Sequence, residues 1–239
     1  MHVELFEIAE RFRGPPRSGN GGYVCGRIAR HLQGAVAVQL KAPPPLKAEL
    51  RLESADEGAR LFQDTILIGE ARRTHLEMQP PPSPTFVEAE QSLQGFPGFK
   101  SHPFPGCFVC GPERKPADGL RLFPGSVNGS SVIATPWKPD ASLADESAKI
   151  RSEFLWAALD CTGGFAVLPL PEGVAIVLGE LCASIIAEVA PAEPCVVIGW
   201  PLGADGRKRL AGSAVYAANG RLVAKARAVW IEVPASTWI

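Results

Sequence analysis

The stretch EFLWAALDCTGGF, residues 153–165, carries the pattern from which the fold follows. Its apolar side chains Phe154, Leu155, Ala158 and Leu159 lie on one side of a helix and predict that this helix is buried. Four segments with the composition of strands follow it: residues 175–189, 195–200, 210–217 and 221–233. A helix followed by an antiparallel sheet that covers it is an α+β unit.

The end of the chain predicts how helix and sheet meet. The last two segments are joined through Ala218-Asn219-Gly220, and Asn-Gly is a strong hairpin signal. One face of the final segment carries Leu222 and alanines at 224, 226 and 228, while the other face carries Arg221, Val223, Lys225 and Arg227. Because alanine side chains are small, we expect the helix to lie close to this strand.

The first half repeats the same order. A charged strand-like run over residues 3–12 leads to Asn20-Gly21-Gly22, and the spacing of Val24, Ile28 and Leu32 predicts a helix over 23–32. Extended segments are expected at residues 35–41, 46–53 and 61–70, and in the second half at 120–123 and 132–137.

Proline and glycine are densest between the halves. The run QPPPSPT, residues 79–85, cannot hold a helix or a central strand, because each proline lacks an amide donor and fixes φ. We therefore expect an N-terminal unit over residues 1–78, a linker lying across the surface over 79–116, and a C-terminal unit over 117–239.

Composition excludes several classes of function. The chain has 24 basic and 25 acidic residues, a net charge of −1, which argues against a nucleic-acid or anionic-membrane partner. Its first residues lack the pattern of a signal peptide, and its longest apolar region is broken by charges and prolines. We expect a cytoplasmic protein with reduced thiols.

Three stretches resemble the tandem, or double, hotdog-fold acyl-CoA thioesterase-like proteins. They are NGGYVCGRIARHL at residues 20–32, CFVCGPERKPADGLRLFPG at 107–125 and NGRLVAKARAVWIEV at 219–233. The resemblance implies two hotdog units in one chain, each a central helix wrapped by an antiparallel sheet, which together form a pseudo-dimer. It also implies hydrolysis of an acyl-CoA or acyl-carrier thioester, with coenzyme A as part of the substrate and no separate cofactor.

In that family, a turn of His or Asn followed by two glycines begins the central helix, and an acid lies nine residues after the first position of the turn. Asn20-Gly21-Gly22 matches the turn, but the position nine residues on is Ala29. In the second helix Asp160 matches the acid, whereas Arg151 stands nine residues before it and begins no such turn. The resemblance thus implies one complete site, in which Gly21 and Gly22 face Asp160.

The resemblance also implies roles for these residues. The amides of Gly21 and Gly22, at the positive end of a helix, would polarise the thioester carbonyl. Asp160 would act as general base or as nucleophile, and Thr162 would orient a water or the carboxylate. The alternatives are an Asp160 that bonds Thr162 or backbone without chemistry, an Asn20 that only caps its helix, and a Thr162 that lies at the surface.

Other signals are weaker. Candidate partners for the phosphates of coenzyme A are Arg207, Lys208, Arg209, Lys225 and Arg227, although such a run is also typical of a solvated turn. The Asp/Thr/Gln set of tandem thioesterases is incomplete here, because the Gln position falls near Ala228 and no Thr lies around Gly203.

The pair Cys107 and Cys110, with His102 nearby, resembles half of a zinc site. A single Cys-x-x-Cys supplies too few ligands, so we expect no metal and take both residues as small apolar parts of the linker. The partner we expect is an acyl-CoA-type small molecule, with neither nucleic acid nor membrane, and a homodimer of such chains is possible on this scaffold. Two alternatives stay open: a non-catalytic acyl or acyl-CoA binding protein, and a structural pseudo-dimer without ligand.

Overall fold

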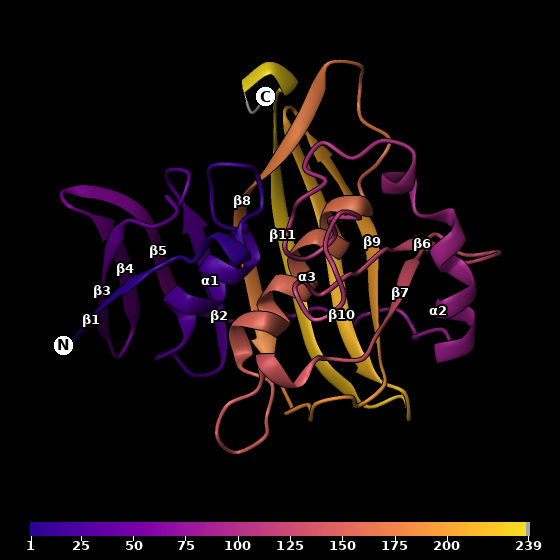
Figure 1. The fold of residues 1–239 in the computed structure, drawn as a ribbon, viewed down its shortest axis with the longest axis horizontal. Coiled ribbons are helices and arrows are strands. Elements are labelled where there is room, and N and C mark those ends of the chain that lie inside the picture. Colours follow the sequence, from indigo (N-terminus) through magenta and orange to yellow (C-terminus); the bar gives the residue numbers. More distant parts are fainter. Residues whose placement is uncertain (238–239) are drawn as a thin grey trace.

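The computed structural model describes residues 1–237, and its strands form a single antiparallel sheet. Eleven strands follow the order β1-β3-β4-β5-β2-β8-β11-β10-β9-β7-β6. Figure 1 shows the first five at one end of the sheet and the other six at the other end. The two groups meet where β2 pairs with β8, with Ala35 opposite Ser184 and Gln39 opposite Glu180.

The first group comes from the first third of the chain. Its elements are β1 (His2–Glu7), α1 (Gly21–Ala29), β2 (Ala35–Leu40), β3 (Glu49–Ala55), β4 (Gly58–Gln63) and β5 (Ile66–Thr74). The expected segment 61–70 is two strands, because Asp64 adopts a positive φ of 51° and turns the chain. The run 3–12 ends as a strand at Glu7 and continues as the short 3-10 helix η1 (Glu10–Phe12).

The second group contains the longest strands. Its elements are β6 (Gly125–Ser126), β7 (Ile133–Trp137), α3 (Ser152–Phe165), β8 (Val174–Ile185), β9 (Cys195–Asp205), β10 (Lys208–Ala217) and β11 (Leu222–Pro234). The expected strand at 120–123 is wrong, because Arg121 has a φ of 55° and interrupts the extended backbone. Leu120 and Leu122 instead donate hydrogen bonds to the carbonyls of Phe108 and Val109.

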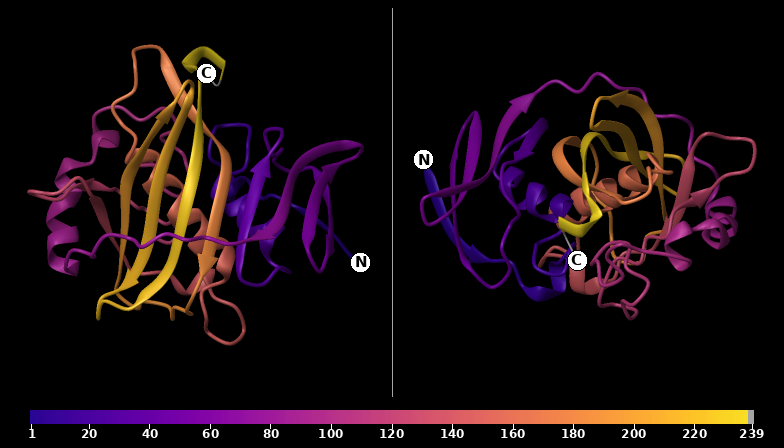
Figure 2. Two further views of the ribbon diagram at one scale, coloured as in Figure 1. Left: turned by 180° about the vertical axis from the view of Figure 1, so that it is seen from behind. Right: turned by 90° about the horizontal axis from the view of Figure 1, so that it is seen from above.

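The helices α1 and α3 lie side by side, inside the curve of the strands (Figure 2, right). The alanines at 224, 226 and 228 are fully buried on the face of β11 that packs against α3, as the alternation predicts. The two helices approach closely because α1 has glycines four residues apart on one face. A Cβ at Gly22 would lie 2.3 Å from the Cβ of Asp160, and one at Gly26 would lie 2.5 Å from the Cα of Glu153.

The segment 79–116 has two parts. Its first part crosses the outer face of the sheet (Figure 2, left), where Pro81 accepts a hydrogen bond from the Tyr216 hydroxyl. It then forms α2 (Phe86–Ser92) and the 3-10 helices η2 (Leu93–Gly95) and η3 (Pro97–Phe99). The second part enters the core, where Phe96 and Phe108 are buried. Short 3-10 helices at Ala141–Leu143 (η4) and Ala235–Thr237 (η5) complete the elements. Among the described residues, no helix is both long and apolar enough to cross a bilayer.

Candidate active site

The N-terminus of α1 is capped by Asn20. The Asn20 Oδ1 atom accepts a hydrogen bond of 2.9 Å from the backbone N–H of Tyr23, and the backbone of Asn20 is extended, as in an ordinary helix cap. Its Nδ2 atom points the other way and donates to Asp160 Oδ2 at 3.0 Å. Asn20 therefore caps its own helix and contacts the neighbouring helix with one side chain.

Asp160 lies in the middle of α3, directly opposite this cap. Its Oδ2 atom accepts from the Gly22 N–H at 2.8 Å in addition to Asn20, while Oδ1 is buried without a partner among the described residues. Neither half of the chain contains both the turn and the acid. The turn Asn20-Gly21-Gly22 of the first half and Asp160 of the second half nevertheless lie together. The carboxylate is anchored by one oxygen and has the other available.

The environment of Asp160 changes its acidity. The side chain is 2% exposed, and burial raises its pKa to about 7, against the lowering effect of the hydrogen bonds from Gly22 and Asn20. A carboxyl group of that acidity exists in both protonation states near neutral pH. It can take up a proton and return it, as a general base requires.

A cavity of about 680 Å³ opens beside this pair. Asn20, Gly21 and Asp160 form part of its wall, and most of the remaining wall is apolar. The apolar side chains come from β8, from β11 and from the end of α3 with the loop after it: Ile176, Val177, Leu178, Trp230, Ile231, Phe165, Leu168 and Leu170. The volume and the apolar wall suit an acyl or similar apolar group that places a polar head at Asp160.

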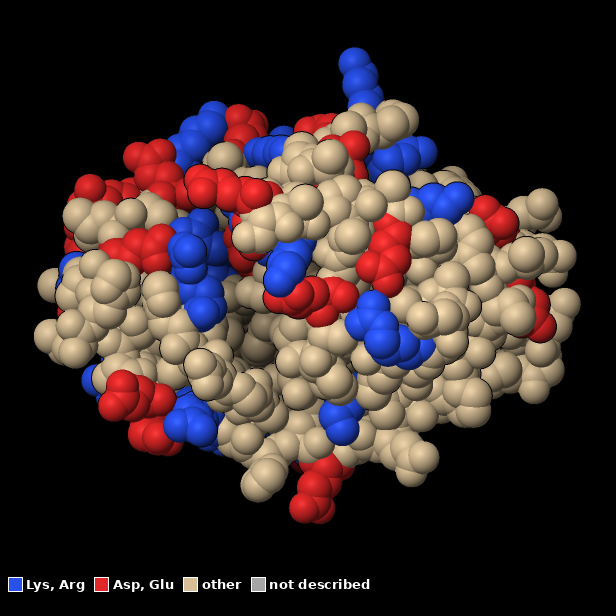
Figure 3. Space-filling view, turned by 90° about the horizontal axis from the view of Figure 1, so that it is seen from below, with Lys and Arg blue, Asp and Glu red and all other residues tan. Residues whose placement is uncertain are grey.

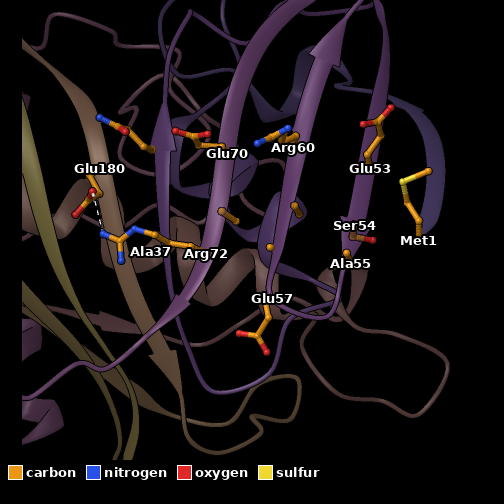
Figure 4. Close-up of a pocket in the computed structure, with 14 residues that line it drawn as sticks. Met1, Ala37, Glu53, Ser54, Ala55, Glu57, Arg60, Glu70, Arg72 and Glu180 are labelled. Atoms are coloured by element: carbon orange, nitrogen blue, oxygen red, sulfur yellow. Dashed lines mark ion pairs between the residues drawn. The ribbon is translucent and has the colours of Figure 1, made fainter.

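A second depression, of about 530 Å³, has several charged side chains in its wall (Figure 4). It crosses the strands of the first group, and the side chains that line it include Glu57, Glu70 and Glu180 with Arg60 and Arg72. Arg72 lies 4.0 Å from Glu180, so opposite charges already face one another there. It offers neither an apolar wall nor the end of a helix, and we assign the site to the cavity beside Asp160.

The glycines do not all have the expected role. The Gly22 N–H is held by Asp160, so it anchors the acid and is not free to polarise a carbonyl. The Gly21 N–H has no acceptor within residues 1–237, and Gly21 lines the cavity. Of the two amides expected to bind the thioester oxygen, the structure leaves that of Gly21 available.

Thr162 is placed away from the cavity wall. It is fully buried, and its hydroxyl has no partner among the described residues. A surface position and a hydrogen bond to Asp160 are both wrong for this residue, since Asp160 bonds Asn20 and Gly22 instead. Thr162 therefore lies behind the cavity wall, and its expected role in orienting a water or the carboxylate stays a prediction.

None of the five expected phosphate partners lines the cavity. Lys225 donates to the Met78 carbonyl at 2.8 Å and holds the segment that crosses the outer face, and Arg227 is exposed on the same strand. Arg209 pairs with Glu232. Arg207 and Lys208 are exposed at the β9–β10 turn. On the face shown in Figure 3, acidic and basic side chains are interspersed around a hollow.

Sequence reasoning missed one group of residues in this wall. Cys161, the residue after Asp160, lies beside Cys107 and Cys110, and the three sulfurs are within 4.8 Å of one another. The Cys107 and Cys161 sulfurs are 3.8 Å apart, and Asn20 Nδ2 lies 3.5 Å from the Cys161 sulfur. Hydrogen bonds from Cys110 and Cys161 lower the pKa of Cys107 well below its ordinary value. The signal in the sequence was a cysteine next to the predicted acid, which becomes informative only once α3 is known to face residues 107–110.

The strand order, with both helices inside the curve of one antiparallel sheet, defines the chain as a hotdog-type α+β protein. Its fold is similar to that of a tesB protein of Mycobacterium avium subspecies paratuberculosis, with a TM-score of 0.65, 10% identity and coverage of 97% of this chain and 93% of that one. It is also similar to a putative thioesterase II of Thermobifida fusca, with a TM-score of 0.64, 15% identity and coverage of 98% and 93%.

An acyl-CoA thioesterase II, TesB2, of Mycobacterium marinum gives a TM-score of 0.61 at 12% identity, covering 97% of this chain and 93% of that one. No protein-family model matches the chain. No curated protein matches it by sequence. The expected resemblance is therefore confirmed for the fold over nearly the whole chain, and these neighbours carry the names of thioesterases.

Proposed function

We propose that this protein hydrolyses the thioester of an acyl-CoA or acyl-carrier substrate, and that Asp160 activates the attacking water. One observation carries the proposal: a buried carboxylate, anchored through Oδ2 at the N-terminus of α1, borders an apolar cavity, and its Oδ1 has no hydrogen-bond partner in residues 1–237. The thioesterase names of the structures with the same fold support this choice of reaction.

The chemical steps follow from that placement. Asp160 Oδ1 takes a proton from water while the water oxygen attacks the thioester carbon. The carbonyl oxygen gains negative charge, which the Gly21 N–H and the positive end of α1 stabilise. The tetrahedral intermediate then expels the thiolate, and the proton held by Asp160 passes to the leaving sulfur. The products are a carboxylic acid and a free thiol.

We also propose the two-unit organisation for this chain. Residues 1–78 and 117–239 would each be a hotdog unit, and the pairing of β2 with β8 would take the place of a dimer contact. In this arrangement α1 supplies the helix end, α3 supplies the acid, and a single site arises between the two units.

Within this proposal, Arg207 and Lys208 are the candidates for the phosphates of coenzyme A. Lys208 pairs with Ile231 in the β10–β11 ladder, and Ile231 lines the cavity. The Glu232 N–H donates to the Arg207 carbonyl and fixes the turn at the same place. Guanidinium and ammonium groups there would meet phosphates outside a cavity that holds the acyl chain.

The test is release of free thiol from acetyl-, octanoyl-, palmitoyl- and aromatic acyl-CoA by the wild type and by Asp160→Asn. Turnover of one class that collapses in the variant is the expected result. Equal turnover in both proteins would remove Asp160 from the mechanism. A single turnover in ¹⁸O-water tests the role of Asp160. Label in the Asp160 carboxylate would show a covalent acyl-Asp160 anhydride cleaved by water at the Asp160 carbonyl, whereas a general base leaves Asp160 unlabelled and sends the label to the product acid.

A second candidate function is non-catalytic binding of an acyl or acyl-CoA ligand. The specific observation in its favour is that Asp160 occupies the Gly22 N–H, which leaves one amide instead of two for the developing oxyanion. Tight binding by calorimetry without release of thiol from any substrate would support this function over hydrolysis.

A further inference from the structure

Three cysteines from two distant parts of the chain meet beside the cavity. Cys107 and Cys110 come from the segment before β6, and Cys161 comes from α3. All three are free thiols and buried, so their proximity results from the packing of these segments and not from a disulfide. Thiolate sulfur is the ligand preferred by zinc and other soft metal ions.

The geometry suits a tetrahedral ion. Zinc bound to sulfur at about 2.3 Å holds neighbouring sulfurs about 3.8 Å apart. The Cys107 and Cys161 sulfurs are 3.8 Å apart, and the sulfur of Cys110 lies within 4.8 Å of both. The three sulfurs are therefore close enough to one another to be ligands of a single metal ion.

The turn that carries the first two cysteines is tightly built. Gly111 donates its N–H to the Cys107 carbonyl at 3.0 Å, and a Cβ at this position would lie 2.5 Å from that oxygen. The Cys107 N–H donates to Phe104 at 2.8 Å and the Phe108 N–H donates to Arg13 at 2.8 Å. A turn held in this way fixes the positions of its side chains before any ion binds.

A hydrogen-bond donor lies beside one of the sulfurs. The Asn20 Nδ2 atom donates to the Cys161 sulfur at 3.5 Å. N–H donors directed at sulfur are typical of the second layer around metal-bound thiolates, whose negative charge they offset.

The structure also indicates what the fourth ligand is not. His102 lies in the same cavity wall, and its Nδ1 accepts a hydrogen bond of 2.9 Å from the Phe104 N–H. In the neutral ring the proton is then on Nε2, so neither nitrogen offers a lone pair to a metal ion. All three cysteines line the cavity, so a fourth ligand would come from that side, as in zinc sites that exchange a water or a substrate group.

We propose that Cys107, Cys110 and Cys161 bind one zinc ion as thiolates, with the fourth coordination position open to the cavity beside Asp160. Binding releases the thiol protons to solvent and oxidises nothing. This inference does not depend on the proposed hydrolysis, because it concerns metal binding and is read out without a thioester substrate.

The first experiment measures metal content after expression with zinc, purification under reducing conditions and dialysis. We expect about one zinc per wild-type chain, the same content in Asp160→Asn, and none in the double variant Cys107→Ser, Cys110→Ser. The matched control is Cys182→Ser, because Cys182 is a buried cysteine of β8 outside the cluster. We expect this variant to contain as much zinc as the wild type. Folded, reduced wild type without metal, or zinc retained in the double variant, would overturn the proposal.

If the double variant fails to fold, a second measurement tests the proposal on the wild type alone. Zinc is removed with a chelator and replaced by cobalt. Thiolate-to-cobalt charge transfer in the near ultraviolet, with the visible bands of a tetrahedral site, is the expected spectrum. Absence of charge transfer, or a Cys107–Cys161 disulfide as the stable state of the protein under zinc and reductant, would count against a metal site and for a redox-active thiol pair.

Discussion

The helices α1 and α3 lie side by side inside the curve of the sheet, but their N-terminal ends and their central residues differ. α1 begins with two glycines after a side-chain cap at Asn20, whereas α3 begins at Ser152, and Arg151 before it makes no side-chain cap. α3 carries Asp160 nine residues after Arg151, while the residue nine positions after Asn20 in α1 is Ala29. The comparison teaches that neither helix holds a site by itself, and that the contact between them creates one.

The change expected to have the largest effect removes the acid from α3. Asp160→Asn keeps the size of the side chain and an oxygen for the Gly22 N–H, but cannot take a proton from water. We expect turnover to fall by about 10²–10⁴-fold, the usual contribution of a general base. Steady-state thiol release measures it, with Asp205→Asn at an exposed position as the control. Unchanged turnover would mean that the asymmetry of the helices is unrelated to chemistry.

The next change separates the helices. Gly22→Ala places a methyl group 2.3 Å from the Cβ of Asp160 and 2.6 Å from the Trp156 carbonyl. We expect a loss of about 1–3 kcal/mol in the free energy of unfolding, as for other overpacked sites, together with a loss of turnover. Denaturant unfolding measures the first quantity.

Gly163→Ala is the matched control for that change, because it lies on α3 where a Cβ would meet nothing closer than 3.6 Å. Alanine is preferred over glycine inside a helix, so this variant should be as stable as the wild type or more so. Equal destabilisation by both substitutions would show that the close approach at Gly22 has no special part in stability.

Asn20 allows its two contacts to be tested separately. Asn20→Ser retains a cap for α1 but loses the hydrogen bond to Asp160, whereas Asn20→Ala loses both. We expect the free energy of unfolding of Asn20→Ala to be about 1 kcal/mol lower than that of Asn20→Ser. Both variants should lose turnover, because both lose the hydrogen bond to Asp160. Equal stability of the two variants would contradict the capping role seen in the structure.

The smallest expected effects concern the basic residues. Lys208→Gln should raise KM for acyl-CoA by up to about fivefold, or about 1 kcal/mol, with a smaller increase at high salt. Arg227→Gln, on the outer face of β11, should change KM only slightly, by an amount that corresponds to no more than about 0.5 kcal/mol in binding free energy. The reverse order would move the phosphate site to the outer face of the sheet.

Much of this architecture was predictable from local patterns. The two helices, the hairpin at Asn219-Gly220 and the alanine face of β11 follow from spacing and turn chemistry that each segment carries by itself. Turns made by single residues in unusual conformations were not predictable: positive φ at Asp64 divides one expected strand and at Arg121 removes another. Neither residue is a glycine, the residue type that most often marks such a backbone conformation.

The candidate site was predictable only in part, for the same reason. The facing of Gly22 and Asp160 came from a family resemblance, since nothing near residue 22 indicates what lies 138 residues away. The use of the Gly22 N–H by the acid, the inward position of Thr162 and the meeting of Cys161 with Cys107 depend on the angle and distance between helices. Such quantities are properties of the packed molecule and have no local signature.

The bond between Gly22 and Asp160 also has a consequence for the order of folding. It joins groups 138 positions apart in the chain, so its formation carries the entropy cost of closing a long loop. During synthesis α1 leaves the ribosome well before α3, so the side of α1 that contacts α3 has no partner until α3 has been made. Recovery of activity on refolding should therefore trail the recovery of helical signal, because the site is among the last parts of the molecule to form.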